Sequence, residues 1–150
     1  MIRPIVAADA DMVAALIRSA FASLETTLVP SPSALLVSAE SVLAHLDAGG
    51  GGALHDEDGC VLWDVREGGL YLSRLAVHEA ARGRGVGLAL VRHGEAVARA
   101  AGLPRVHLEV RLALTGNRRL FRRAGFVEGR MHAHPGFDHP TYVSAEKRLD

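Results

Sequence analysis

The feature that most constrains the fold is a glycine- and arginine-rich turn between two apolar stretches. Residues 70–77 read LYLSRLAV, and residues 82–87 read RGRGVG. The first stretch has the length and apolarity of a buried strand. Apolar residues then recur at helical spacing from about Gly85 to Ala101, and Gly102 ends the pattern. Such a turn is either a crowded strand-to-helix connection or a phosphate-binding site, because free N–H groups converge at a helix N-terminus.

The turn has the chemical properties of a phosphate site. Its three glycines leave the backbone open, and its two arginines add positive charge. The residues concerned are Arg82, Gly83, Arg84, Gly85 and Gly87. Two common phosphate-binding patterns do not match. The dinucleotide pattern G-x-G-x-x-G would need glycine in place of Leu88, and the Walker pattern needs a G-K-[ST] that the chain lacks.

Periodicity and turn residues predict one mixed α/β domain, residues 1–150. The predicted order is a strand, two helices, three strands, a helix, a strand, a helix and two strands. Asp9 is expected to cap the first helix and Ser38 to begin the second, and residues 26–37 are expected to form a loop. In the strand at residues 105–112, His107, Glu109 and Arg111 alternate with an apolar face.

Composition and charge narrow the functional classes. No apolar run approaches the ~20 residues that span a bilayer, and the N-terminus lacks the pattern of a signal peptide, so we expect a cytoplasmic protein without membrane contact. The lone Cys60 excludes an intramolecular disulfide. Zero net charge and few aromatic residues argue against nucleic-acid binding. The first 60 residues are acidic, and with Glu25 they favour a cationic ligand.

Three segments together resemble the GNAT superfamily of acyl-CoA N-acyltransferases. Residues 82–87 resemble its R/Q-x-x-G-x-G/A pyrophosphate loop, LAV at 75–77 resembles its fourth strand, and FRRAGF at 121–126 resembles its aromatic-x-x-x-G-F signature. The resemblance implies a GNAT-type α/β fold, with a central mixed and mostly antiparallel sheet of about six to seven strands flanked by about four helices. It also implies acetyl transfer from acetyl-CoA to a primary amine, on a small molecule or a peptide, by direct attack in a ternary complex.

The resemblance further implies a binding site for acetyl-CoA as the acyl donor. The loop amides would hold the pyrophosphate, and the pantetheine arm would lie along residues 75–77 as an added strand. The Val77 N–H would then stabilise the oxyanion of the thioester carbonyl. The family spacing would put its coenzyme-contacting asparagine nearer Leu114 than Asn117. The implied coenzyme-binding residues are Leu75, Ala76, Val77, Arg82, Gly83, Arg84, Gly85, Val86, Gly87, Asn117 and Phe121.

The residue that accepts the proton of the amine does not follow from the family pattern as directly as the coenzyme loop does. An amine attacks a thioester only as the free base, so a group must remove its proton. The family often places this base on its fourth strand, where the chain has Tyr71 and Ser73. Glu109 on the neighbouring strand is the best remaining carboxylate. The alternative is a structural ion pair of Glu109 with Arg111 or Arg74.

The expected proton donor is missing. The family commonly uses a tyrosine at the start of the aromatic signature, where this chain has Phe121, which cannot donate a proton. Three alternatives follow. Tyr142 protonates the leaving thiolate, water does so, or the protein binds acyl-CoA without transferring from it. With Val77 and Glu109, Tyr142 completes the expected catalytic set.

Two clusters allow other readings. His132, His134 and His139 with Asp138 contain metal-ligand chemistry, but H-x-H in a proline- and glycine-broken loop has no known ligand spacing. We therefore expect no metal and place this loop beside the acceptor. A short arginine-rich helix could contact a coenzyme phosphate, bind RNA or present a solvated face. Its arginines are Arg118, Arg119, Arg122 and Arg123. A homodimer is left open.

Overall fold

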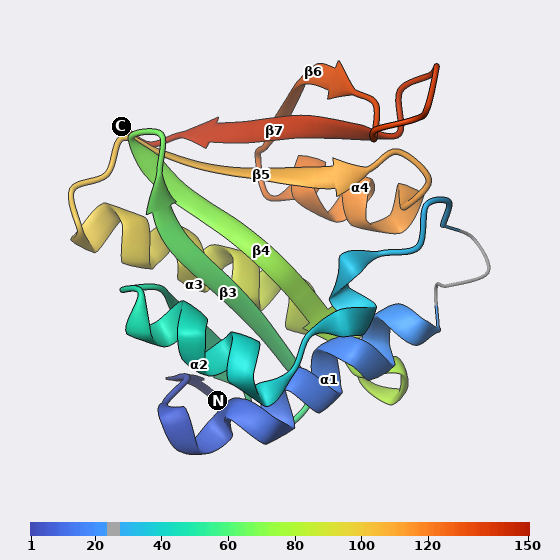
Figure 1. The fold of residues 1–150 in the computed structure, drawn as a ribbon. Helices are drawn as coiled ribbons and strands as arrows, with labels where there is room; N and C mark the ends of the chain where they lie inside the picture. Colours follow the sequence, from blue (N-terminus) through green and yellow to red (C-terminus); the bar gives the residue numbers. More distant parts are fainter. Residues whose placement is uncertain (24–27) are drawn as a thin grey trace.

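The sheet has seven strands in the order β1-β2-β3-β4-β5-β7-β6 (Figure 1). The structure is a computed structural model that describes residues 1–23 and 28–150. The strands are β1 (Ile2–Pro4), β2 (Gly51–His55), β3 (Gly59–Arg66), β4 (Gly69–Val77), β5 (Arg105–Arg111), β6 (Val127–His132) and β7 (Tyr142–Arg148). The helices are α1 (Ala10–Ala22), α2 (Ala39–Asp47), α3 (Val86–Ala100) and α4 (Thr115–Arg123). The predicted order of elements and the predicted fold class are confirmed.

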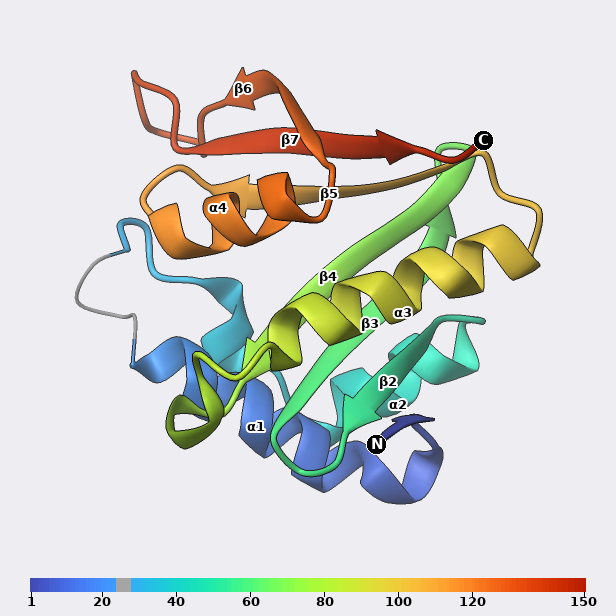
Figure 2. The same ribbon diagram turned by 180° about the vertical axis from the view of Figure 1, so that it is seen from behind.

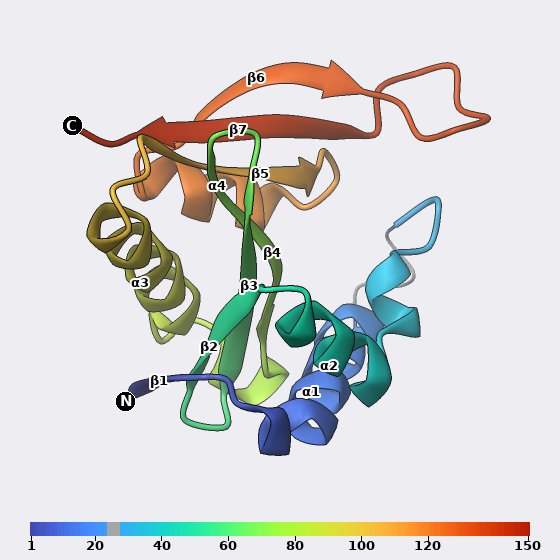
Figure 3. The ribbon, with the colours of Figure 1, turned by 60° about the vertical axis from the view of Figure 1, so that its left-hand side comes forward.

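Helices cover both faces of the sheet. Helices α1 and α2 lie on one face, and α3 and α4 lie on the other, as the view from behind and the turned view show (Figures 2 and 3). Each layer has its own buried core. On the α1 side, Val13 and Ile17 belong to one buried cluster with sheet residues such as Leu54. On the α3 side, Leu90 and Val91 belong to a second buried cluster with sheet residues such as Val61. These two cores hold α1 and α3 on opposite sides of β4.

Strands β4 and β5 form the only parallel pair in the described part of the chain, and they separate soon after they meet. Their pairing is limited to Leu70 with Val106 and Tyr71 with His107. Beyond Tyr71 the two strands diverge, which Figure 1 shows as a wedge that opens toward the C-terminal end of β4. Residues 72–77 therefore have no strand partner on their β5 side among residues 1–23 and 28–150.

Strand β4 also carries a β-bulge. Cys60 pairs with Ala76 and Leu62 pairs with Ser73, so β4 has one residue more than β3 over this interval. Arg74 lies within the bulge and has a φ of +52°, a left-handed conformation that is uncommon for a residue other than glycine. The bulge changes the direction in which the following part of β4 presents its side chains.

The first two helices begin in different ways. Ser38 caps α2 as predicted, because its hydroxyl accepts the Ser41 N–H at 3.2 Å. The predicted cap by Asp9 is wrong, because its carboxylate accepts no hydrogen bond from the first turn of α1. The carboxylate instead accepts hydrogen bonds from the Val6 N–H and from Nη1 and Nη2 of Arg3, each at 2.8 Å. The predicted loop contains a short 3-10 helix at Ser33–Leu36, and its residues 26–27 lie outside the described part.

The Asp9 carboxylate makes the stability of the fold sensitive to acid. The Arg3 guanidinium, with the Val6 N–H, holds the pKa of Asp9 below its ordinary value. This stabilisation is fully present above the pKa of an unfolded Asp, about 3.9, and is lost as pH falls through the lower folded value. We expect Asp9→Asn to be less stable than wild type in urea unfolding at pH 7, with the difference shrinking below about pH 4. Asp11→Asn, which removes an exposed carboxylate of α1, is the control; an equal loss there would contradict this account.

In the described residues, no helix combines the length and the apolarity needed to cross a membrane.

Candidate active site

A cavity of about 640 Å³, here the loop cavity, lies where β4 ends and α3 begins. The end of α1, β4, the glycine loop and α4 all contribute to its wall. Most of the residues expected to bind the coenzyme line it: Leu75, Ala76, Val77, Arg82, Gly83, Gly85, Val86, Gly87 and Asn117. Arg84 and Phe121, which were expected there too, are not among its lining residues. The fold thus brings nine of the eleven expected residues to one cavity.

The glycines of the loop serve different purposes. Gly83 and Gly85 have φ angles of +81° and +79°, and a Cβ on either would meet nothing within 4 Å. Their backbone conformation, and not lack of space, therefore requires glycine. Gly87 is buried, and a Cβ there would lie 2.9 Å from the Leu120 side chain of α4. Gly87 lets α4 pack closely against the first turn of α3.

The start of α3 supplies hydrogen-bond donors to the loop cavity. Gly85 is the N-cap residue, and the Ala89 N–H donates to the Gly85 carbonyl at 3.0 Å as the first bond of the helix. The N–H groups of residues 86–88 precede that bond and have no partner within the helix. Together with the helix dipole they favour an anion at this end of the cavity.

Arg82 fastens this region to α1. Its guanidinium donates to the Ala20 carbonyl and the Ser23 hydroxyl, each at 3.0 Å, and to the Val77 carbonyl at 3.3 Å. The side chain therefore holds the end of α1 against the end of β4. Its charge remains beside the glycine loop, but its donors face carbonyl and hydroxyl groups of the protein.

The Val77 amide faces the open side of β4. The His78 N–H donates to the Asp58 carbonyl at 2.7 Å, across to the β2–β3 turn. Successive amides along a strand point in opposite directions, so the Val77 N–H points away from β3. This is the orientation that a donor to a ligand in the wedge needs.

A second cavity, of about 340 Å³, lies in the wedge between β4 and β5 and is called the wedge cavity here. It shares four wall residues with the loop cavity: Phe21, Leu75, Leu114 and Asn117. Glu109, Phe121 and Tyr142 line it as well. The two cavities therefore adjoin, and the expected acid and base groups belong to the second one.

Glu109 pairs with a tyrosine and not with an arginine. Its carboxylate accepts the Tyr71 hydroxyl at 3.2 Å. Burial, followed by the nearby Glu109 charge, raises the pKa of Tyr71 to about 12, so this hydroxyl stays protonated at neutral pH. The alternative ion pair is wrong, because Arg74 donates to the Ser33 hydroxyl and Arg111 donates to the Pro30 carbonyl.

His134 is a wedge-cavity residue whose chemistry the sequence did not single out. Its Nδ1 contacts the Thr141 hydroxyl, which also accepts the His134 N–H at 3.0 Å. Burial, together with the Arg111 charge, holds the pKa of His134 below its ordinary value, so the imidazole is neutral at pH 7 and able to accept a proton. The loop sequence contained the signal, but it did not distinguish His134 from His132 and His139.

The two aromatic residues of interest have different surroundings. Phe121 is buried and packs against Phe126, with ring centroids 5.9 Å apart. Tyr142 is half-buried and stacks on His132 at 4.9 Å. Of these two, only Tyr142 has a hydroxyl to offer a thiolate.

The comparison with known proteins identifies the family. The family model described as "Acetyltransferase (GNAT) family" matches residues 38–126, which is more than half of the chain. The chain belongs to the GNAT family of acetyltransferases. It is therefore an acyltransferase, and the resemblance noted in its motifs is confirmed. No curated protein sequence matches this GNAT chain.

Solved structures of other acetyltransferases share the fold. PaiA N-acetyltransferase from Thermoplasma acidophilum, in complex with coenzyme A, superposes with a TM-score of 0.78 at 15% identity, covering 99% of this chain and 98% of that one. Ribosomal-protein-alanine N-acetyltransferase from Brucella melitensis gives 0.76 at 18% identity, with 99% of both chains covered. A GNAT-family acetyltransferase from Streptococcus pneumoniae gives 0.76 at 20% identity, covering 100% and 99%. At these identities the likeness shows the GNAT fold alone.

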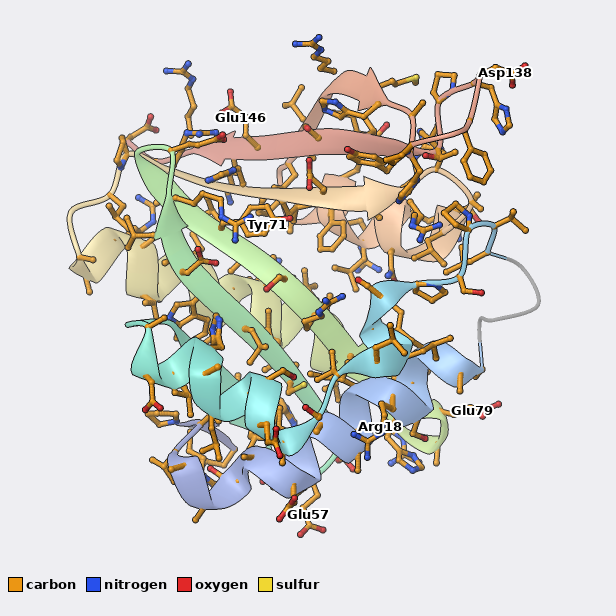
Figure 4. The ribbon with its side chains drawn as sticks, viewed as in Figure 1. Arg18, Glu57, Tyr71, Glu79, Asp138 and Glu146 are labelled. Atoms are coloured by element: carbon orange, nitrogen blue, oxygen red, sulfur yellow. The ribbon has the colours of Figure 1, made fainter. Side chains whose placement is uncertain are left out.

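The histidine-rich loop of this GNAT chain does not gather its candidate ligands. His132 contacts the Ser144 hydroxyl, and His139 contacts Asp138. Asp138 lies at the tip of the β6–β7 loop and points outward, far from Tyr71 (Figure 4). Of the histidines, only His134 lines the wedge cavity. The expectation that this loop lies beside the acceptor stays a prediction.

The arginine-rich helix α4 divides its charges. Arg118 donates to both carboxylate oxygens of Glu128, at 2.9 and 2.8 Å, so a fully solvated face is wrong for this residue. Arg119 and Arg123 line the loop cavity of the GNAT fold. Glu25, which favoured a cationic ligand, lies outside the described residues.

Proposed function

We propose that this GNAT acetyltransferase transfers the acetyl group of acetyl-CoA to a primary amine by direct attack, with both substrates bound together. The observation that carries the proposal is the shared wall of the loop and wedge cavities, Phe21, Leu75, Leu114 and Asn117. A donor in one cavity and an acceptor in the other would meet at this wall without an acetylated enzyme between them.

The loop cavity has the features that the donor requires. The positive-φ glycines and the unbonded amides at the start of α3 suit a pyrophosphate, and Arg119 and Arg123 suit a further phosphate. The open side of residues 72–77 suits the amide groups of a pantetheine arm. The Thermoplasma acetyltransferase, which shares this fold, was solved in complex with coenzyme A, which supports a coenzyme A thioester as the donor.

The wedge cavity supplies groups for each proton transfer. Glu109 would take a proton from the amine as its nitrogen attacks the thioester carbonyl, and the Val77 N–H would stabilise the oxyanion. The carbon–sulfur bond would then break, and Tyr142 would protonate the leaving thiolate. The products are the N-acetyl amine and coenzyme A. We place the reaction in the cytoplasm, as the sequence predicts.

Release of free thiol from acetyl-CoA across a panel of primary amines tests the proposal. We expect turnover with at least one class of amine, intersecting lines in initial-velocity plots at varied donor and acceptor, and an N-acetylated product by mass spectrometry. Parallel lines would contradict direct attack and indicate a mechanism with an acetyl-enzyme intermediate. Tight acetyl-CoA binding without turnover of any amine would favour binding without transfer.

A further inference from the structure

The β-bulge of β4 sets the direction of an arginine. The extra residue lies between Ser73 and Ala76, and Arg74 within this interval has the left-handed φ of +52°. A left-handed conformation is costly for an arginine, and such conformations persist where the surrounding structure enforces them, often at functional sites. Bulges beside active sites commonly redirect one side chain. Here the redirected residue, Arg74, lines the wedge cavity.

The Arg74 guanidinium has no anionic partner in the described part of the chain. Its Nη1 donates to the Ser33 hydroxyl at 3.1 Å, and no carboxylate of residues 1–23 or 28–150 lies within 4.0 Å of it. Burial holds the pKa of Arg74 below its ordinary value, which means that the surroundings oppose its charge. A partly desolvated cation of this kind is stabilised by an anion that enters the cavity.

A second guanidinium faces the same cavity. Arg111 donates to the Pro30 carbonyl at 2.8 Å and to the Ser31 carbonyl at 3.5 Å, and none of the described carboxylates forms an ion pair with it. Burial lowers the pKa of Arg111 too. Of the described carboxylates, only Glu109 lines the wedge cavity, and it already accepts the Tyr71 hydroxyl. Among the described residues, two cationic side chains and one anionic side chain line the cavity.

We propose that the acceptor is a primary amine that also carries an anionic group, a carboxylate or a phosphate, and that Arg74 binds this group. This inference rests on the proposed amine acetylation and names its substrate class. The planar guanidinium matches both anions, because it can donate two parallel hydrogen bonds. Glu109 remains beside the amine. The acidic N-terminal half had favoured a cationic acceptor, and the charges of the described wedge-cavity residues favour an acceptor that carries both a positive and a negative charge.

Matched pairs of amines that differ only in the anion test the inference. Suitable pairs are β-alanine with 3-aminopropanamide, L-lysine with L-lysinamide, and O-phosphoethanolamine with ethanolamine. We expect the anionic member of at least one pair to have the higher kcat/KM, by about tenfold or more. A preference within the first two pairs identifies a carboxylate, and a preference within the third identifies a phosphate.

Arg74→Gln separates anion binding from the chemistry. We expect it to raise KM for the preferred anionic amine by about tenfold or more and to leave KM for its neutral partner unchanged. The affinity for acetyl-CoA should also be unchanged. Arg74→Lys should restore part of the preference. Arg130→Gln, at an exposed arginine of β6 outside both cavities, is the control and should behave as wild type.

The outcomes distinguish this inference from the function on which it rests. Equal or better turnover of the neutral amines overturns the anionic acceptor and leaves amine acetylation standing. An anion preference that persists in Arg74→Gln overturns the role of Arg74. If no amine of any charge is acetylated although acetyl-CoA binds, amine acetylation itself is overturned, and this inference falls with it.

Discussion

Replacing Gly85 with valine is expected to weaken acetyl-CoA binding by about 100-fold or more. Gly85 caps α3 at a φ of +79°, a conformation that a β-branched residue does not readily adopt. The strain would turn the first amides of α3 away from the loop cavity, and the new side chain would stand where the pyrophosphate approaches. Calorimetric titration of acetyl-CoA into wild type and Gly85→Val measures the effect, with circular dichroism to check the fold.

Gly102→Val provides a matched control. Gly102 follows the other end of α3, its φ is +71°, and a Cβ there would also meet nothing within 4 Å. The backbone penalty is thus similar, but the position is remote from the loop cavity. We expect Gly102→Val to lose stability and to keep wild-type affinity for acetyl-CoA. Unchanged affinity in Gly85→Val, or equal losses in both variants, would make the glycine loop a structural turn.

Replacing Glu109 with glutamine is expected to lower kcat by about 10²- to 10⁴-fold, the usual contribution of a general base. Glutamine keeps the shape of the side chain and can still accept the Tyr71 hydroxyl, but it cannot take the proton of the amine. The rise of kcat with pH should flatten, and the affinity for acetyl-CoA should stay as in wild type. Steady-state kinetics over a range of pH, with the amine identified by the acceptor panel, measures both effects.

Glu146→Gln is the control for Glu109→Gln. Glu146 lies on β7, forms an ion pair with Arg105 at 3.0 Å and does not line the wedge cavity. We expect the Glu146→Gln variant to have the kcat of the wild type. A wild-type pH profile in Glu109→Gln would return Glu109 to a structural role and move attention to His134. Because the pKa of His134 is lowered, a base at that position would lose activity only below the usual range of imidazole, and His134→Gln would remove this acidic limb.

The fold was predictable because its signals are local. Turn residues and the two hydrophobic periods, with the Ser38 cap of α2, mark the elements within short segments, and the order of the elements agrees with the structure. The glycine loop was visible for the same reason, since its positive φ angles belong to single residues. The replacement of the family's tyrosine by Phe121 could also be recognised from the sequence, because this residue has a defined place in a short motif.

The contents of the wedge cavity were less predictable because they depend on distant parts of the chain. The one-residue bulge that redirects Arg74 leaves no mark in the apolar run LYLSRLAV. The same holds outside that cavity for His107, which was placed on the polar face of its strand. It is buried, and its Nε2 lies 2.8 Å from the carbonyl of Arg66, the last residue of β3. The partner of Glu109 is Tyr71 on the neighbouring strand, and the alternative that paired Glu109 with Arg111 or Arg74 did not include it.

Because β4 separates from β5, a bound donor could change the stiffness of the sheet. Strands β1 to β4 form one part of the sheet, and β5, β7 and β6 form the other. In the structure as described, strand pairing joins the two parts at two residue pairs, Leu70 with Val106 and Tyr71 with His107. A pantetheine arm along residues 72–77 would bridge these two parts of the sheet, at a place where side-chain contacts join them but the described backbone forms no strand pairing. Binding of the donor would then make the sheet stiffer and, in the same step, complete the site at which the acceptor reacts.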